Sequence, residues 1–210
     1  FYNLDLQNTS SANDYIVNFN VEGTVGEILI DNCNISKTRG VVRVQSDGAK
    51  GSIGSINIDN CVLTDIGSYG VLQTKVSGFT LNSVSLSNST VNTLSAGGVL
   101  VTQQDNVHIS IDACTFYNCV ATGKSFIDIN KMSNVTVDVK NTIIGQLYSY
   151  TAESTIKATS VKGIATTTNL FTTTDCPYNS GYEWGEILSV SSTELFVNPA
   201  EGDFHIQSAS

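Results

Sequence analysis

Four charged side chains are the first candidates for chemistry in this chain of 210 residues. Asp128 would lie on the outer side of a recurring strand, and Lys131, Lys157 and Arg43 are the cations expected near it. A carboxylate beside a lysine or an arginine can transfer protons as a general acid or base. At a protein surface, the same residue types usually form an ion pair worth less than about 1 kcal/mol. We prefer the ion pair and keep catalysis by these four residues as the alternative.

Three aromatic residues near the C-terminal end are candidates for binding a ligand. Tyr178, Tyr182 and Trp184 lie close together in a segment that follows the last clear repeat. Their flat rings could stack on sugar rings while the phenol and indole groups form hydrogen bonds. We prefer the alternative that these rings cover the open end of the core, because an uncovered end exposes strand edges.

Composition excludes several functional classes. The 10 basic and 19 acidic residues give a net charge of −9, which argues against nucleic acid because phosphates require Lys and Arg. No run of about 18 apolar residues exists, so no membrane-spanning helix is expected. With two histidines and no Cys-x-x-Cys, we predict no metal and no cofactor. Asp31 and Asp59 could together hold a cation weakly, but we prefer a solvated polar edge.

An internal repeat indicates which elements position these candidates. Ile28-Leu-Ile-Asp-Asn-Cys33 returns as Ile56-Asn-Ile-Asp-Asn-Cys61, and looser copies precede and follow them. Apolar and polar residues alternate in each copy, which is typical of a strand with one buried face. The predicted buried rows are Leu4, Ile28, Ile56, Val84, Ile109, Val137, then Leu6, Ile30, Ile58, Leu86, Ile111, Val139, and then Ile35, Leu63, Val91, Phe116, Ile144.

A second strand recurs between these copies with the same period. Its predicted inward rows are Val17, Val42, Val71, Val99, Ile127, Ile156 and Phe19, Val44, Gln73, Val101, Ile129, Ala158. Its predicted outward row is Asn18, Arg43, Leu72, Leu100, Asp128, Lys157. Two independent rows with one period are a strong sign of a repeat fold.

The period of 24 to 29 residues, without any helical pattern, predicts that each repeat is one turn of a wound coil. Stacked coils pair each strand with its equivalent about 4.8 Å away, which makes a parallel β-helix. We therefore predict an all-β fold with a single β-helix of about six coils over residues 1–165. An irregular C-terminal cap of the same domain is predicted over residues 166–210.

Two columns of side chains should run along the coils. Asparagine at one corner tolerates left-handed backbone geometry and can bond to its equivalents in neighbouring coils. The predicted ladder is Asn8, Asn32, Asn60, Asn88 and Asn141, with Ala113 as a break. Cys33, Cys61 and Cys114 fall in the next column, where we prefer reduced thiols packed in the core to a disulfide between adjacent coils.

The tandem Ile-x-Ile-Asp-Asn-Cys coils and the C-terminal Leu195-Phe-Val-Asn-Pro-Ala-Glu-Gly-Asp-Phe-His-Ile-Gln207 segment resemble one protein family. The chain is similar to the pectate-lyase-like right-handed parallel β-helix proteins of gut Bacteroidetes, many of which are domains of unknown function in surface proteins. The resemblance implies a right-handed coil, the C-terminal part of a surface protein, an extracellular or outer-surface location and a polysaccharide partner. Lyases of this kind use Lys or Arg as the base and hold calcium with several carboxylates.

We expect a non-catalytic surface module that binds or displays polysaccharide, because fold alone does not assign activity. The outward row around Asp128 holds one carboxylate, and the loops look too short to wall a deep cleft. The alternative is a polysaccharide (uronate) lyase or a fragment of one, for which calcium would be the cofactor. Because Phe1 begins inside a coil in this register, we also expect an upstream domain of the same chain.

Overall fold

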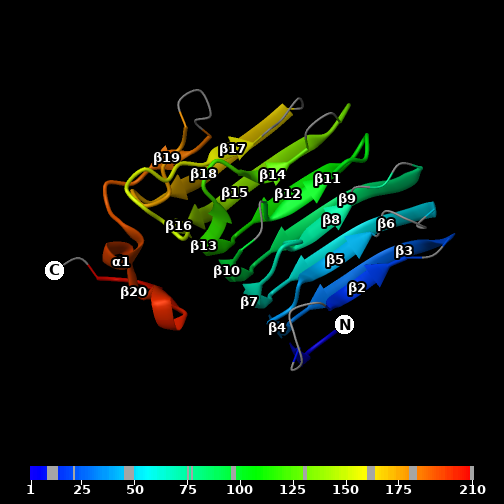
Figure 1. Ribbon diagram of the computed structural model, residues 1–210, viewed down its shortest axis with the longest axis horizontal. Coiled ribbons are helices and arrows are strands. Elements are labelled where there is room, and N and C mark those ends of the chain that lie inside the picture. The colour runs from blue at the N-terminus through cyan, green and yellow to red at the C-terminus, as the bar shows by residue number, and fades with distance from the viewer. Residues whose placement is uncertain are drawn as a thin grey trace.

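The computed structural model is a parallel β-solenoid in which each turn of the chain adds a strand to each of three rows (Figure 1). It describes residues 1–8, 14–20, 22–44, 50–74, 76, 78–95, 98–129, 132–159, 164–179 and 184–208. Stacked parallel strands confirm the predicted all-β fold. No helix in these ranges is long and apolar enough to cross a membrane.

Three rows of strands make up the solenoid. Row one contains β3 (Glu22–Asp31), β6 (Lys50–Asp59), β9 (Phe79–Ser87), β12 (His108–Asp112), β15 (Thr136–Ile144) and β18 (Ile164–Thr172). Row two contains β1 (Asp5–Gln7), β4 (Asn34–Ser36), β7 (Val62–Ile66), β10 (Thr90–Leu94), β13 (Thr115–Ala121) and β16 (Leu147–Tyr148). Row three contains β2 (Tyr15–Phe19), β5 (Gly40–Val44), β8 (Leu72–Thr74), β11 (Leu100–Thr102), β14 (Ser125–Asp128) and β17 (Lys157–Thr159).

The interior is built from apolar side chains that take equal places in successive turns. In row one, Ile30 pairs with Ile58, Ile58 with Leu86, and Leu86 with Ile111. Each of these four side chains is at most 1% exposed. Buried and exposed residues therefore alternate along these strands as the sequence predicts. The buried side chains of one turn lie directly on those of the next.

The register of row three differs from the predicted one. Leu72 and Leu100 pair with each other and are buried, although the alternation predicts them on the outer face. Val71 and Val99, just before them, are buried as well. The chain turns a corner at these positions, so two consecutive side chains point into the core. Gln73, predicted inside, instead lies on the outer face beside a surface pocket.

Asparagines in the left-handed conformation hold one corner of the solenoid. Asn60 has a φ of 50°, and its Nδ2 donates to Oδ1 of Asn32 over 3.0 Å. Asn32 donates in the same way to Asn3 over 3.0 Å. The first member of the ladder is therefore Asn3 and not Asn8, whose backbone N–H donates to Ser36 at a different corner. The Leu-x-Leu-x-Asn pattern around Asn8 imitates the repeat, but it falls in row two.

Aspartates replace the amide acceptors further along this corner. Asn88 donates to Oδ1 of Asp59 over 2.8 Å, and Asn141 donates to Oδ1 of Asp112 over 2.9 Å. Ala113 occupies the corner between them with a φ of 53° and has no side-chain amide to continue the ladder.

Regular coils continue past the predicted boundary at residue 165. β18 pairs in parallel with β15, and Asn169 donates to Oδ1 of Asn141 over 3.0 Å. Thr167 pairs with Val139, so threonine replaces the apolar residue that marked earlier strands. The segment predicted to be an irregular cap therefore begins as a solenoid strand. Beyond it lie β19 (Glu186–Ile187), α1 (Ser192–Leu195), β20 (Phe196–Asn198), η1 (Pro199–Glu201) and β21 (Asp203–Ile206), with β20 antiparallel to β21.

A buried polar network fixes this C-terminal segment to the end of the solenoid. Oγ of Ser192 donates to Oδ1 of Asp175 over 3.0 Å and accepts the backbone N–H of Gln146 at 2.7 Å. Oγ1 of Thr173 donates to the same Asp175 oxygen over 2.5 Å. Ser192 is fully buried, so these hydrogen bonds have little competition from water.

All five cysteines are buried free thiols, as we predict for the column behind the asparagine corner. The backbone N–H of Cys33 donates to Sγ of Cys61 over 3.4 Å, and that of Cys61 donates to Oγ of Ser89 over 3.0 Å. Cys114 donates to Oγ1 of Thr142 in the same manner. The column therefore accepts any small side chain that offers a sulfur or oxygen acceptor, which explains why Cys, Ser and Thr alternate there.

Candidate functional site

A surface pocket of about 340 Å³ lies on the outer face of row three. Successive turns contribute its main lining residues, which are Tyr69, Gln73, Gly98, Lys124, Asp128 and Lys157. An aromatic ring, an amide, two ammonium groups and one carboxylate therefore border a single hollow. The lining is mostly polar, with the Tyr69 ring and Val101 as its apolar parts.

Gly98 lies between turns that contribute larger side chains to the pocket. It is buried against the next turn, and a Cβ at this position would lie 2.9 Å from the carbonyl oxygen of Ser125. Tyr69 comes from the preceding turn and Lys124 from the following one. The glycine therefore permits the two turns to approach closely at the pocket.

Two of the four residues considered for catalysis meet in this pocket. Asp128 and Lys157 line it, and Lys124 joins them. Arg43 lies on β5, three strands away from Asp128 on β14, and it does not line the pocket. Lys131 lies outside the described residues. Arg43 and Asp128 therefore do not converge on one reacting atom.

Arg43 belongs to a cluster of aromatic and cationic side chains beside the pocket. Its guanidinium carbon lies 4.3 Å from the ring centroid of Tyr69, and its Nη1 donates to Oη of Tyr15 over 2.8 Å. The guanidinium carbon of Arg39 lies 4.6 Å from the same Tyr69 centroid. The rings of Tyr15 and Tyr69 meet edge to face, with their centroids 5.5 Å apart. They contact Gly40, where a Cβ would lie only 2.9 Å from Cβ of Tyr69. Gly40 thus permits the rings to approach.

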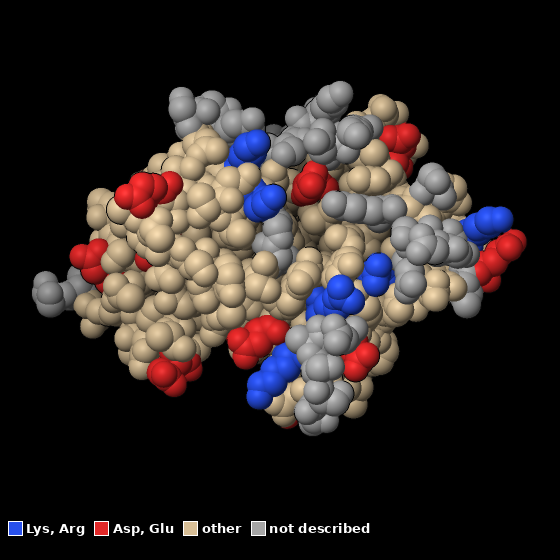
Figure 2. All heavy atoms as spheres, in the orientation of Figure 1, with Lys and Arg blue, Asp and Glu red and all other residues tan. Residues whose placement is uncertain are grey.

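Four cationic side chains lie on this face although the chain as a whole is acidic. Arg39, Arg43, Lys124 and Lys157 lie there together with Asp128, whereas the net charge of the chain is −9. Figure 2 shows both Lys or Arg (blue) and Asp or Glu (red) on the viewed face. Burial raises the pKa of the Tyr15 phenol, and the neighbouring Arg43 opposes that rise. The phenol therefore stays protonated at neutral pH and can accept the hydrogen bond from Arg43.

The pocket does not fit calcium, the ion that a lyase of the resembled kind would hold. Calcium takes six to eight oxygen ligands, usually including several carboxylates. Asp128 is the single carboxylate in the lining, and no group of three His, Cys, Asp or Glu within the described ranges could hold a metal ion. Asp59, considered above for a weak cation site, instead accepts hydrogen bonds from Ser87 and Asn88, which lower the pKa of its carboxyl.

The aromatic residues near the C-terminal end divide between the core and the surface. Tyr178 is only 9% exposed, so its ring is not available to stack on a sugar. Trp184 is half-buried against Phe126, with ring centroids 5.8 Å apart, and it also borders a hollow of about 390 Å³. Tyr182 lies outside the described residues. Packing at the end of the solenoid is thus the observed role of Tyr178.

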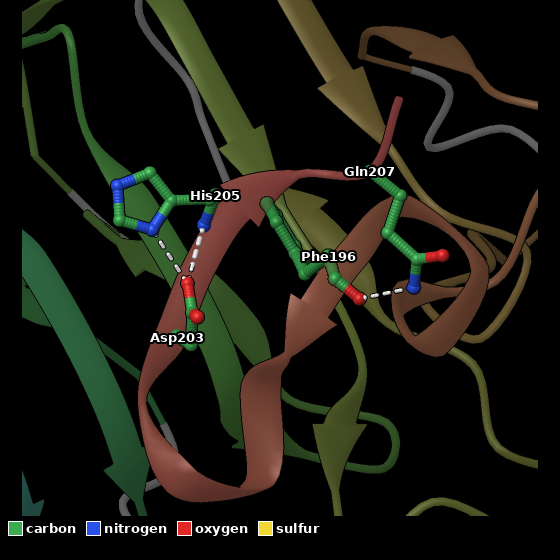
Figure 3. A network of polar contacts seen from close by, with 4 residues as sticks. All are labelled: Phe196, Asp203, His205 and Gln207. Carbon is green, nitrogen blue, oxygen red and sulfur yellow. Dashed lines mark hydrogen bonds and ion pairs between the residues drawn. The ribbon is translucent and has the colours of Figure 1, made fainter. Parts of the chain in front are cut away.

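A third hollow, of about 500 Å³, separates the C-terminal hairpin from row two. Its lining includes Thr90, Thr115, Glu201, Asp203, Phe204 and His205. On the hairpin side, Oδ1 of Asp203 accepts the backbone N–H of His205 and lies 2.6 Å from its Nδ1, and Gln207 donates to the carbonyl oxygen of Phe196 (Figure 3). These bonds stay within the hairpin and stabilise its fold.

Sequence reasoning did not identify Arg39, Tyr69 or Gln73 as site residues. The predicted register of row three turns Gln73 inward and places Leu72 on the surface. Glycines at Gly40, Gly70 and Gly98 recur just before successive strands, and they were the available signal that the chain turns a corner there. Once that corner is recognised, the pairing between strands of row three predicts which residues lie on the outer face.

The fold and the site define a parallel β-solenoid protein with a basic pocket on one face. Residues 109–210 match the family model described as Domain of unknown function (DUF5123). The match includes the last solenoid turns together with the C-terminal hairpin. Neither the curated proteins nor the solved structures yielded a match to the chain.

Proposed function

We propose that this protein is a non-catalytic module that binds a polysaccharide on the outer face of row three. The observation that carries the proposal is the pocket that Tyr69, Gln73 and Lys124 border together. The amide of Gln73 and the ammonium group of Lys124 offer hydrogen bonds to hydroxyl groups, and the Tyr69 ring, over which both arginines lie, forms a wall beside them.

The repeat geometry favours a linear polymer over a compact ligand. Strands of row three follow one another about 4.8 Å apart along the solenoid axis. Tyr69, Gly98 and Lys124 lie just before successive strands of that row. A polymer laid along the axis would therefore meet contacts from several turns, and many weak contacts add up to useful affinity.

The lining supports binding more than cleavage. Glycoside hydrolysis generally uses two carboxyl groups that flank the scissile bond, and among the described residues that line this pocket Asp128 is the one carboxylate. The specific observation in favour of a uronate lyase is that Lys124 and Lys157, either of which could act as a base, lie in the same pocket. Incubation with uronate polymers in the presence of calcium tests it, because a lyase produces the absorbance of an unsaturated uronide.

Binding is tested with a panel of polysaccharides of known composition. We expect the wild-type chain to bind at least one polymer without product formation, and Gln73→Ala and Lys124→Ala to weaken that binding. Thr80→Ala, an exposed change in β9 of row one, is the matched control and should leave affinity unchanged. Equal affinity for all four proteins would place the contact elsewhere, and no binding to any polymer would refute the proposal.

We further propose that the module acts outside the cell or at the outer surface, in a larger surface protein with an upstream domain. The support is the resemblance to pectate-lyase-like β-helix proteins of gut Bacteroidetes, to which the asparagine-rich coils point. Antibody labelling of intact cells that express the whole protein tests the location. Labelling only after the cells are permeabilised would contradict it.

A further inference from the structure

The two arginines of the chain lie against one aromatic ring. The guanidinium carbons of Arg39 and Arg43 lie 4.6 and 4.3 Å from the centroid of Tyr69. Among the described residues, neither arginine forms an ion pair, since the pairs observed there join His108 to Asp138 and His205 to Asp203. In a chain with nearly twice as many acidic as basic residues, two neighbouring arginines that form no ion pair with a described residue are unusual.

Cation–π attraction explains how the ring holds the arginines, but it does not neutralise them. Such contacts contribute about 0.5–1 kcal/mol at exposed sites, and the two positive charges still repel each other. Arg43 uses Nη1 for its bond to Tyr15, which leaves other N–H groups of its guanidinium for a ligand. Guanidinium groups held in a fixed plane bind carboxylate or sulfate oxygens through paired hydrogen bonds.

The positive charge extends from this cluster along the solenoid axis. Lys124 and Lys157 follow on the same face and line the pocket. Asp128 lies in the pocket with them, and the carbonyl oxygen of Asp14 accepts the backbone N–H of Arg39. The face thus offers the arginine cluster and, in the adjoining pocket, two lysines beside one carboxylate.

We infer that Arg39 and Arg43 form an anion subsite that receives a carboxylate or sulfate group, so that the polysaccharide bound on row three is anionic. This inference rests on the proposed function. The ligand is recognised directly by guanidinium groups, with Tyr69 holding them in place and Lys124 and Lys157 meeting a later anionic group of the same polymer. The pocket lacks the carboxylates that a calcium bridge would need, so binding does not require calcium.

The test compares three linear probes, namely a sulfated, a carboxylated and a neutral polysaccharide, by titration calorimetry in the presence of a chelator. We expect the anionic probes to bind more tightly than the neutral one, and their affinity to fall as salt is raised. Arg39→Gln with Arg43→Gln should weaken anionic binding about tenfold or more, since charge-assisted hydrogen bonds are lost. Lys140→Gln removes one exposed charge from row one and should change little.

Two controls distinguish a loss of binding from a loss of folding. Thermal melting checks that each variant is folded, and Arg39→Lys should keep part of the affinity because it retains the charge and loses the paired hydrogen bonds. The stronger of the two anionic probes identifies sulfate or carboxylate as the group bound.

The outcomes separate this inference from the proposed function. Tight binding of a neutral polymer that the arginine variants do not affect would overturn the inference and leave the proposed function intact. Binding of free sulfate or of an acidic monosaccharide at the arginines, with no polymer bound, would support the anion subsite and refute the proposal that the ligand is a polysaccharide. No binding of any probe would refute both.

Discussion

At the scale of single residues, one corner of the solenoid selects for asparagine. Seven residues in one column have φ between 47° and 54°, and all but one are asparagine. They are Asn3, Asn32, Asn60, Asn88, Ala113, Asn141 and Asn169. The left-handed region strains residues with a Cβ by about 1–2 kcal/mol, and asparagine offsets part of that strain with local hydrogen bonds. The recurrence of asparagine in the sequence therefore reflects the left-handed backbone conformation of this corner.

Ala113→Asn should stabilise the protein. Asparagine relieves strain at a φ of 53° and restores the amide that the ladder lacks, which together should contribute about 0.5–1.5 kcal/mol. The measurement is the urea concentration at the midpoint of unfolding. Asn141→Ala is the opposite change at the next turn and should lower the midpoint; movement of both midpoints in the same direction would contradict the ladder.

The buried thiols should be unreactive in the folded protein. Burial raises the pKa of Cys61 to about 11 and those of Cys114 and Cys119 to about 12, so almost no thiolate is present at pH near 8. A chromogenic disulfide reagent should react slowly with the native chain and quickly in denaturant. Ser208→Cys supplies an exposed control thiol. A native cysteine that reacts as fast as this control would refute the packing described for the column.

At the scale of elements, the corner before each strand of row three decides what faces solvent. Two consecutive residues are buried at Val71–Leu72 and at Val99–Leu100, so the alternation of the strand starts one position later than the sequence pattern indicates. This shift moves Gln73 to the outer face and into the pocket. A single corner residue therefore determines which side chains are available to a ligand.

Val71→Asp tests the packing of that corner. Val71 is fully buried, and an aspartate there would bring an uncompensated charge into the core, which should cost about 3–5 kcal/mol of stability. Lys124→Ala, an exposed change just before the strand two turns on, should leave the melting temperature nearly unchanged. Similar melting temperatures for the two variants would mean that the corner is not buried as described.

Ser192→Ala tests the attachment of the C-terminal segment. The change leaves the buried N–H of Gln146 without its acceptor and removes one donor to Asp175, which should cost about 1–3 kcal/mol. Hydrogen exchange should then accelerate in the hairpin more than in the central turns. Ser189→Ala, an exposed change in the same segment, is the control; equal exchange in the two variants would show that the network does not hold the hairpin.

At the scale of the whole molecule, charge is distributed unevenly. The chain carries 19 acidic and 10 basic residues, yet row three presents both arginines and two lysines on one face. Acidic residues such as Asp31, Asp59 and Asp112 line the asparagine corner instead. Local potential, rather than net charge, therefore governs which charged molecules can approach the pocket.

Asp59 should make the stability of the protein sensitive to acid. Hydrogen bonds from Ser87 and Asn88 lower the pKa of this carboxyl below its ordinary value of 3.8. The stabilisation is therefore complete above that value and is lost as pH falls through the lower pKa of the folded state. Melting temperatures measured between about pH 6 and pH 3 should fall more steeply for the wild type than for Asp59→Asn. Asp5→Asn should keep the wild-type slope; equal slopes for all three proteins would contradict the prediction.

The fold could be predicted from the sequence because the core of a solenoid is repetitive. Ile30, Ile58, Leu86 and Ile111 recur at spacings of 25 to 28 residues and alternate with polar residues, and that pattern is satisfied only if equivalent side chains stack. The prediction from this pattern was wrong at both ends of the solenoid, where the repeat is least regular. Asn8 imitated a ladder residue, and the threonines of β18 concealed the last regular strand.

The site, in contrast, depends on how the turns pack against one another. Arg39, Tyr69 and Lys124 lie about one or two turns apart in sequence, and nothing local to any of them indicates a shared surface. Their meeting depends on how many residues each corner contains, and Gly98 matters through the side chain it lacks. Alternation reports which residues are buried within one strand, whereas a pocket depends on the register between strands, and that register is set by packing across turns.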